Sequence, residues 1–372
     1  MTLARPHVAF LPALAHITAA VIPVKEWKAG EFDPTSQMLG SGPHMVVRHN
    51  QDESWTLEAN PHYGGDALPK VGRIEVPIIP DESARIAAPR DGRIDVTTFE
   101  NPDVSLLLAR DANMQIDAIR TTNYYRVDVN ALSDASPFKD ERVRRAMSLA
   151  TDRDAINAAV FGGATQVDQP VPIAFGVGAC DAAESYVGTR EERLAKAKAL
   201  LAEAGTPTPE VAPMASSANL TLGRIAQVMQ QSLAPAGFDV TIEQVPTAEY
   251  LQRVFTDGDF DFSLGWLAGY TDPSMVIAWW NPKFAIWNGL FHVYDEALAT
   301  ALEEVEQLPV GETRNAKLVE ICEAIDRQAN ILALTSKVDY LVSRTDKVKV
   351  IADAVSGSSN TFRHIAGFES LD

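Results

Sequence analysis

The alternation of strand and helix patterns between residues 190 and 267 restricts the fold more than any other feature of the sequence. Short runs of alternating or apolar residues, which are typical of strands, occur at 210–214, 238–245 and 259–266. Helical apolar stripes occur between and before them, at 190–204, 222–233 and 247–255. This order predicts parallel strands joined by right-handed crossover helices. We therefore expect an open α/β sheet in this part of the chain.

Helix signals are clearest around residues 189–205. Thr189 and Glu192 have the spacing of a capping box, and Gly205 stands where a left-handed cap is expected. Further amphipathic helices are predicted at 143–150, 298–305 and 318–325.

Strand patterns are found on both sides of this region. Segments 45–49 and 54–60 resemble paired strands, 74–79 resembles another, and a helix is predicted from Glu82 to about Ala88. In YYRVDVN, Tyr125, Val127 and Val129 alternate toward a core, and Asn130 follows at an expected crossing between lobes. The run ILALTSKVDYLV is predicted to be a strand that returns the chain to the first lobe.

Charge and length exclude several classes of protein. The 372 residues carry a formal charge of −18, which argues against nucleic acid as a partner. No apolar run reaches the roughly 18 residues of a membrane span. The first 24 residues superficially resemble a secretion signal, but Pro6, Pro12 and His16 interrupt the run, and we interpret it as part of a domain.

Two cysteines are too few for a disulfide framework, and their spacing matches no zinc or redox motif. Cys322 lies in an apolar helical stripe, so a plain core residue is favoured. Whether it pairs with Cys180 is left open by the sequence.

Catalytic motifs are absent from the sequence. It contains no HExxH, GxSxG, Walker A or GxGxxG pattern. His44 and His49 are more simply explained as solvated strand residues than as metal ligands, and Asp259 with Asp261 as the wet face of a strand than as a hydrolytic pair. We therefore predict no catalytic residues, no metal and no cofactor.

Aromatic residues gather instead just after the strand at 259–266. In open α/β sheets, ligands bind outside the carboxyl ends of the strands, where this loop lies. Concave aromatic walls with a few polar anchors are typical of binding sites. For Trp279 and Trp280, core and ligand wall are about equally expected. The candidate ligand-binding residues are Trp266, Gly269, Tyr270, Asp272, Trp287 and Asn288, with Ser216 and Asn219 at a helix start.

Motifs spread over most of the chain resemble those of one family, the extracytoplasmic solute-binding proteins of ABC importers, family 5, which includes dipeptide, oligopeptide and nickel binders. LGSGPH resembles its GTGPY turn, LEANPHYGG its N-P-x-Y-W-G-G segment, and IIPDESAR its I-P-D-x-x-A-R segment. SPFKDERVRRAMSLATDRDAI is similar to its P-F-x-D-x-R-V-R-x-A run, and ERLAKAKALLAEAG to its A-K-x-L-L-x-E-A-G helix. GWLAGYTDP resembles its W-x-x-D-Y-x-D-P loop.

The resemblance implies a two-lobed periplasmic-binding-protein-like α/β fold of type II, in the large peptide-binder class. We expect a first lobe of residues 1–130 plus 335–372, lacking its N-terminal part, and a second lobe of residues 131–334, joined by hinge strands. Exposed sheet edges and apolar surface would follow, with poor solubility. The family also implies a periplasmic location, although the chain has no evident export signal, and a monomer that meets ABC permease subunits. Arg142, Arg144 and Arg145 are expected to be structural, mostly solvated or paired with acids.

One departure from the family concerns specificity. Peptide binders of the family pair the first aspartate of the W-x-x-D-Y-x-D-P loop with the α-amino group of the ligand, and Gly269 stands there in this chain. Asp272 is retained and is expected either to substitute or to cap the next helix. We therefore expect peptides with a free N-terminus to be disfavoured relative to a neutral, sugar-like or otherwise modified solute.

The sequence thus predicts a non-enzymatic transport protein that captures a small solute, such as an oligopeptide or a sugar-like or modified compound. The alternatives are a hydrolytic enzyme on an α/β scaffold and a nonfunctional remnant of a binding protein.

Overall fold

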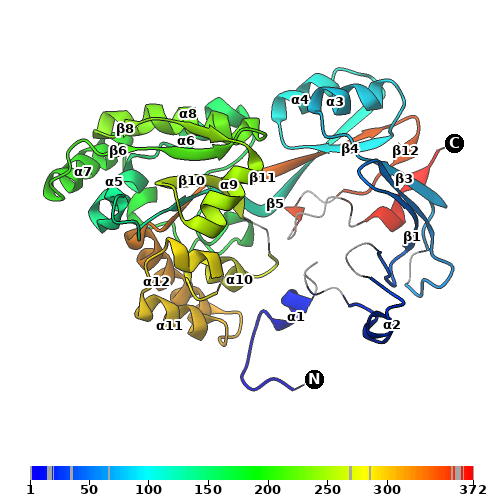
Figure 1. Cartoon of the computed structure of the whole chain (residues 1–372), viewed down its shortest axis with the longest axis horizontal. Coiled ribbons are helices and arrows are strands. Elements are labelled where there is room, and N and C mark those ends of the chain that lie inside the picture. The colour runs from blue at the N-terminus through cyan, green and yellow to red at the C-terminus, as the bar shows by residue number, and fades with distance from the viewer. Residues whose placement is uncertain are drawn as a thin grey trace. The chain divides into compact units, whose positions relative to one another are not determined.

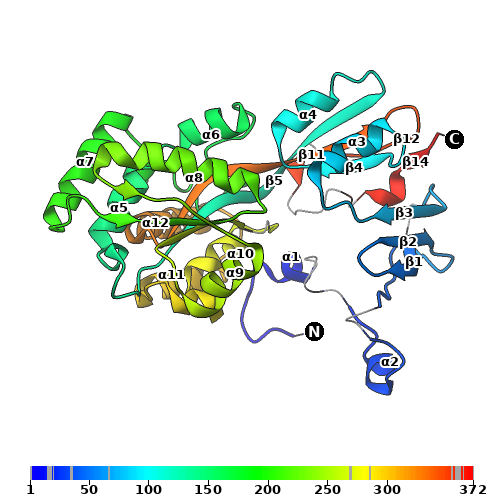
Figure 2. The same cartoon turned by 45° about the horizontal axis from the view of Figure 1, so that its top comes forward.

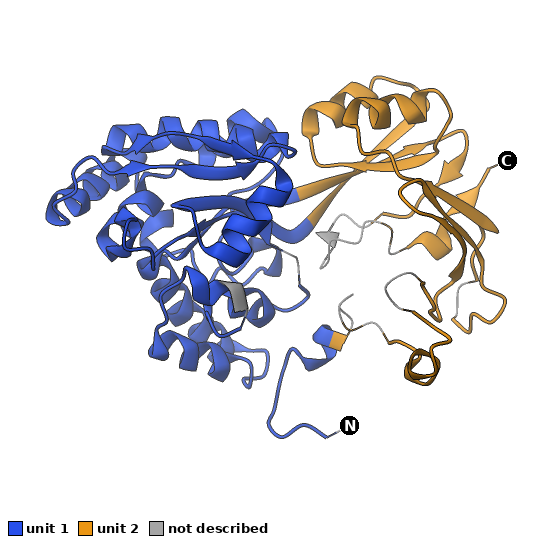
Figure 3. Cartoon of the chain, in the orientation of Figure 1, with its two compact units in different colours: residues 1–13, 121–337, 357–359 blue, residues 14–120, 338–356, 360–372 orange. Residues whose placement is uncertain are grey.

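The structure, a computed structural model, describes residues 2–14, 19, 21–33, 37–65, 68–267, 270–284, 286–352, 355–356, 362 and 364–371. The chain forms two compact units (Figure 3). Unit 1 comprises residues 1–13, 121–337 and 357–359, and unit 2 comprises residues 14–120, 338–356 and 360–372. Two long strands, β5 (Met114–Val129) and β11 (Ile331–Arg344), therefore begin in one unit and end in the other.

A mixed sheet forms the centre of unit 1, in the strand order β11-β5-β10-β7-β9. Its shorter strands are β7 (Pro213–Ser216), β9 (Glu243–Val245) and β10 (Phe262–Leu267). Strand β7 pairs in parallel with both β9 and β10, whereas β10 pairs antiparallel with β5. The three strands of the alternating region are thus parallel, as the sequence predicts.

Helices cover both faces of this sheet (Figures 1 and 2). One face packs on Tyr125 and Val127 of β5, and the other on Tyr124 of β5 and Leu267 of β10. Because both faces are covered, successive residues of β5 are buried whichever way they point. The helices of the first face are α5 (Glu141–Ala150), α6 (Arg153–Phe161), α7 (Arg190–Glu203) and α8 (Leu220–Leu233), and those of the second are α10 (Pro273–Ile277), α11 (Glu296–Val305) and α12 (Glu312–Gln328).

Helix α7 begins and ends as its sequence predicts. The Thr189 hydroxyl accepts a hydrogen bond from the backbone N–H of Glu192, and the Glu192 carboxylate accepts one from the backbone N–H of Thr189. Gly205 adopts φ +72°, a conformation that side chains rarely tolerate. The helices predicted at 143–150, 298–305 and 318–325 lie within α5, α11 and α12.

Several predicted elements differ from the structure. Residues 238–245 do not form one strand: β8 (Asp239–Val240) pairs with β6 (Glu210–Val211), and β9 pairs with β7. The chain changes partner between these segments, so an unbroken sequence alternation covers two short strands. The helix predicted to end near Ala88 is α3 (Glu82–Arg90), because Pro89 is accommodated in its last turn. The helix predicted at 247–255 is α9 (Thr247–Gln252), which a π-helical turn extends to Asp257.

Unit 2 contains a three-stranded antiparallel sheet and the outer ends of the two long strands. The small sheet has the order β1-β2-β3, and β4 pairs with β11. Apolar side chains remain exposed on it, among them Met45, Val47 and Val76. Helix α1 (Phe10–Leu14) belongs to unit 1 except for its last residue. The elements of unit 2 are α2 (Val24–Ala29), β1 (His44–Asn50), β2 (Ser54–Ala59), β3 (Arg73–Pro77), β4 (Val96–Phe99), α4 (Pro102–Leu108), β12 (Val348–Lys349), β13 (Val355–Ser356) and β14 (Glu369–Ser370), together with α3.

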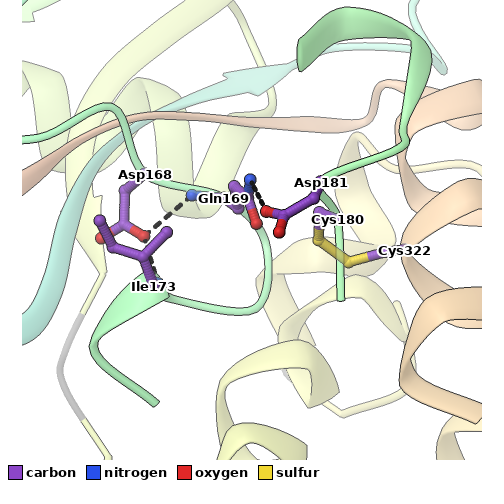
Figure 4. The surroundings of a disulfide bond; sticks show 6 residues. All are labelled: Asp168, Gln169, Ile173, Cys180, Asp181 and Cys322. Carbon is purple, nitrogen blue, oxygen red and sulfur yellow. Dashed lines mark hydrogen bonds between the residues drawn. A yellow bond between two sulfur atoms is a disulfide. The ribbon is translucent and has the colours of Figure 1, made fainter. Parts of the chain in front are cut away.

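A disulfide joins Cys180 to Cys322 of α12, with 5.3 Å between the Cα atoms (Figure 4). Both residues are fully buried. Cys322 is in the core as predicted, but the expectation of a plain core thiol is wrong. The bond ties the loop after α6 to α12 across 142 residues of sequence, a separation from which no spacing rule could predict a pairing.

Among the described residues, no helix combines the length and the apolar character needed to cross a bilayer.

Candidate functional site

The carboxyl end of β10 lies between β5 and β7 in unit 1, at the position where open α/β sheets bind ligands. Trp266 pairs in register with Tyr125 and leaves 44% of its surface exposed. The ammonium of Lys337, on β11, lies 5.7 Å from the centroid of the Trp266 ring. Trp266 is therefore an exposed aromatic surface beside a cation.

Tyr270, Trp279 and Asn288 form a second group at this end of the sheet. The Thr122 hydroxyl of β5 donates to the carbonyl of Tyr270 at 2.8 Å, and the Asn288 amide donates to the carbonyl of Trp279 at 2.6 Å. Burial raises the pKa of the Tyr270 phenol, which a hydrogen bond with Trp279 and the nearby charge of Arg126 oppose. Tyr270 and Asn288, both predicted site residues, are thus linked through Trp279.

Arg126 brings a buried positive charge to this group. Its guanidinium carbon lies 5.9 Å from the centroid of a Trp279 ring, and its Nη2 lies 3.1 Å from Oδ2 of Asp128. Burial raises the pKa of the Asp128 carboxyl, against the opposing charge of Arg126. Burial also lowers the pKa of His292 well below its ordinary value, and the charges of Arg126 and Arg144 lower it further. His292 is therefore neutral near pH 7, and its Nε2 lies 3.8 Å from Oδ1 of Asp128.

Asp272 is engaged within unit 1. Asp272 is the N-cap of α10. Its Oδ1 accepts hydrogen bonds from the backbone N–H and the hydroxyl of Ser274. The same oxygen lies 2.5 Å from Nη2 of Arg314, and both side chains are almost fully buried. Of the two roles that the sequence left open for Asp272, the capping role is the one with direct contacts.

Ser216 and Asn219 lie at the carboxyl end of β7 and the start of α8. The hydroxyls of Ser216 and Thr247 are 2.8 Å apart, and the side-chain oxygen of Asn219 accepts from the backbone N–H of Leu222 at 3.2 Å. Because β7 and β10 run in parallel, Ser216 lies at the same edge of the sheet as Trp266. Gly269 and the side chain of Trp287 lie outside the described residues.

A cavity of about 320 Å³ opens elsewhere in unit 1, between α11 and α12. Its lining includes Asp295, Leu298, Ile321 and Arg327, and none of the predicted ligand-binding residues contributes to it. Across the described residues no cluster of three or more histidine, cysteine, aspartate or glutamate side chains could hold a metal ion.

Sequence reasoning missed Arg126 and Asp128. The alternation of Tyr125, Val127 and Val129 singled out only one face of the strand, whereas Arg126 and Asp128 on the other face are 6% and 1% exposed. The available signal was a pair of opposite charges two residues apart in an apolar strand. Arg144 is structural as predicted, but it is buried and donates to the carbonyls of Phe138 and Gln328, whereas the sequence predicted a solvated or acid-paired side chain.

Comparison with known proteins gives a consistent result. The family model of bacterial extracellular solute-binding proteins, family 5 (middle), matches residues 1–288. The probable D,D-dipeptide-binding periplasmic protein DdpA of Escherichia coli (strain K12) is 27% identical, over 75% of this chain and 54% of its own length. The glutathione-binding protein GsiB of Salmonella choleraesuis (strain SC-B67) is 26% identical, over 77% of this chain and 56% of its own. These relatives are named as binding proteins and not as enzymes.

The fold has a counterpart among solved structures. The periplasmic binding protein DppA from Helicobacter pylori, solved with the peptide STSA, superposes with a TM-score of 0.80 at 22% identity, over 100% of this chain and 72% of that one. The two-lobed α/β class predicted from the sequence agrees with this likeness. The chain spans about half the length of the curated relatives that it matches. On the family match over residues 1–288, the chain belongs to family 5 of the bacterial extracellular solute-binding proteins.

Proposed function

We propose that this chain is the solute-binding component of an ABC importer. It would capture a small solute between two lobes, of residues 1–130 with 335–372 and of residues 131–334, and deliver it unchanged to the permease subunits. The observation that carries the proposal is the family match over residues 1–288. Relatives named for periplasmic and dipeptide or glutathione binding support a periplasmic site of action. The protein would act as a monomer.

The wall of the solute site is proposed to be aromatic, with polar anchors. Trp266 and Tyr270 would supply ring surface, and Asn288 and Ser216 would supply hydrogen-bonding groups, together with Gly269, Trp287 and Asn219. The exposed ring of Trp266 supports this assignment. Asp272 was also a candidate, but its contacts with Ser274 and Arg314 favour a structural role.

A peptide with a free N-terminus is proposed to be a poor solute. Gly269 offers no carboxylate for an ammonium group, and Arg314 already neutralises the nearby Asp272. A buried ammonium without a partner costs about 3 to 5 kcal/mol, or roughly two to four powers of ten in affinity. The solute is therefore a peptide with a blocked N-terminus, or a sugar-like or otherwise modified compound.

Isothermal titration tests this proposal with dipeptides in two forms. We expect N-acetylated Ala-Ala, Met-Leu and D-Ala-D-Ala to bind more tightly than the same dipeptides with a free N-terminus. Micromolar binding of several free dipeptides would contradict the role given to Gly269. The substitution Gly269→Asp should improve binding only of the dipeptides with a free N-terminus. Gly289→Asp, next to Asn288 in the sequence, serves as a control for added negative charge and should not produce this improvement.

A further inference from the structure

The guanidinium of Arg126 is incompletely satisfied in unit 1. The side chain is 7% exposed, and among the described residues its acidic partner is Asp128, which lies next to Nη2. Its Nε and Nη1 have no hydrogen-bond partner among the described residues. Buried donors without an acceptor are rare in folded proteins because leaving them unmade is costly. These N–H groups are therefore suited to an acceptor that the described chain does not supply.

A second donor lies beside Arg126 on the same face of β5. Tyr124 precedes it by two residues, so both side chains leave the strand on the same side. The phenol of Tyr124 is fully buried, and its hydroxyl also has no hydrogen-bond partner in the described part of the chain. Burial raises the pKa of Tyr124 well above its ordinary value, so the hydroxyl keeps its proton and can donate.

Space for an acceptor is suggested by the residue opposite Arg126. Strand β10 presents Gly265 in register with it, where other positions of the strand carry side chains. A Cβ atom added at Gly265 would meet, among the described atoms within 4 Å, only the Tyr250 hydroxyl at 3.5 Å. The glycine thus leaves room for a Cβ-sized group on the strand surface opposite the guanidinium, in contact with the Tyr250 hydroxyl.

Among the described residues, Asp128 is the acid that pairs with Arg126; it engages Nη2 and leaves Nε and Nη1 without an acceptor. Burial raises the pKa of the Asp128 carboxyl, which favours its uncharged form. His292 contributes no positive charge near neutral pH, and Arg144 donates to backbone carbonyls. Trp279 and Tyr270 provide ring surface next to the guanidinium.

We infer that Arg126, with Tyr124 as a second donor, binds a carboxylate of the solute. The inference rests on the proposed function and narrows its solute to an acid. It is consistent with the glycine at position 269. The site would lack a carboxylate for the cationic end of a solute and would offer a guanidinium to an anionic end. An N–H group of Arg126 gives a carboxylate a charge-assisted hydrogen bond, which is about twice as strong as a neutral one.

The test uses N-acetyl Ala-Ala, Met-Leu and D-Ala-D-Ala, each as the C-terminal acid and as the amide, titrated into the full chain by calorimetry. We expect the acids to bind about 10- to 100-fold more tightly than the amides. In Arg126→Gln this preference should fall to about twofold or less, with the affinity for the amides little changed. Arg145→Gln, which removes a partly exposed arginine paired with Glu184, should keep the full preference.

Two further variants guard against a folding defect. Arg126→Gln combined with Asp128→Asn leaves no unpaired buried charge and should lose the acid preference in the same way. Gly265→Val keeps the guanidinium and fills the space opposite it, and should also weaken the acids more than the amides. Retention of the preference in both variants would overturn the inference.

The outcomes separate the inference from the proposed function. Equal binding of acids and amides by the unmodified chain rejects the carboxylate site and leaves solute binding intact. Failure of every probe to bind, in either form, rejects the carboxylate site and counts against the proposed class of solute as well.

Discussion

Asp168 is a buried carboxylate whose charge should make the stability of this protein depend on pH. One oxygen accepts hydrogen bonds from the backbone N–H groups of Gln169 and Ile173, at 2.9 and 3.0 Å (Figure 4). Its other oxygen has no hydrogen-bond partner among the described residues. Burial raises the pKa of Asp168 to about 7, although the two backbone hydrogen bonds oppose the shift.

The sign and size of the effect follow from proton linkage. The pKa of an unfolded aspartate is about 3.9, so the folded state holds a proton that the unfolded state has lost between about pH 4 and pH 7. Stability due to this group is present in full below pH 4 and is lost as the pH rises to 7. The slope is about 1.4 kcal/mol for each pH unit near pH 5 and flattens as the folded carboxyl itself ionises near pH 7, so the loss between pH 5 and pH 7 is about 2 kcal/mol.

Replacing Asp168→Asn should remove this dependence. The amide oxygen can still accept from Gln169 and Ile173, while the new NH₂ group adds a cost that does not change with pH. Urea unfolding at pH 5, 6, 7 and 8 measures the slope for both proteins. Asp181→Asn, an exposed carboxylate of the same loop, is the matched control and should keep the slope of the unmodified chain. Equal slopes for the unmodified chain and Asp168→Asn would refute the reasoning.

Three other changes test separate parts of unit 1. Replacing Cys180 and Cys322 with serine should lower the free energy of unfolding by about 3 to 5 kcal/mol in non-reducing urea, because the bond closes a long loop; an unchanged midpoint would argue against the bond. Arg314→Met leaves Asp272 buried without its cation and should cost about 3 to 5 kcal/mol in thermal unfolding. Adding Asp272→Asn to that variant should recover part of the loss, and no recovery would contradict the ion pair. Asn219→Ala removes the cap of α8 and should cost about 1 kcal/mol in urea, whereas a change below about 0.3 kcal/mol would contradict that cap.

The sequence predicted those parts of the fold that depend on local patterns. The capping box at Thr189 and the parallel order of β7, β9 and β10 follow from spacing and periodicity, which act over a few residues. The division of residues 238–245 between β8 and β9 did not follow, because the change of partner at Thr241 depends on strands that are distant in sequence. Pairing of the two cysteines is non-local in the same way.

The candidate site stays a prediction. The aromatic residues after β10 predict a binding loop, and in the structure the Asn288 amide donates to the carbonyl of Trp279. The burial of Arg126 was not predicted, because a strand covered on both faces buries its polar residues too. Alternation alone cannot distinguish a covered face from a solvated one.

The central claim is that the chain binds a small solute and leaves it chemically unchanged. Native mass spectrometry of the purified chain with N-acetyl dipeptides tests this directly. The mass of the solute released from the complex is measured after incubation. We predict a non-covalent complex of one chain with one solute, and recovery of the solute at its original mass. A cleaved or otherwise altered product, or the absence of any complex across the set, would contradict the claim.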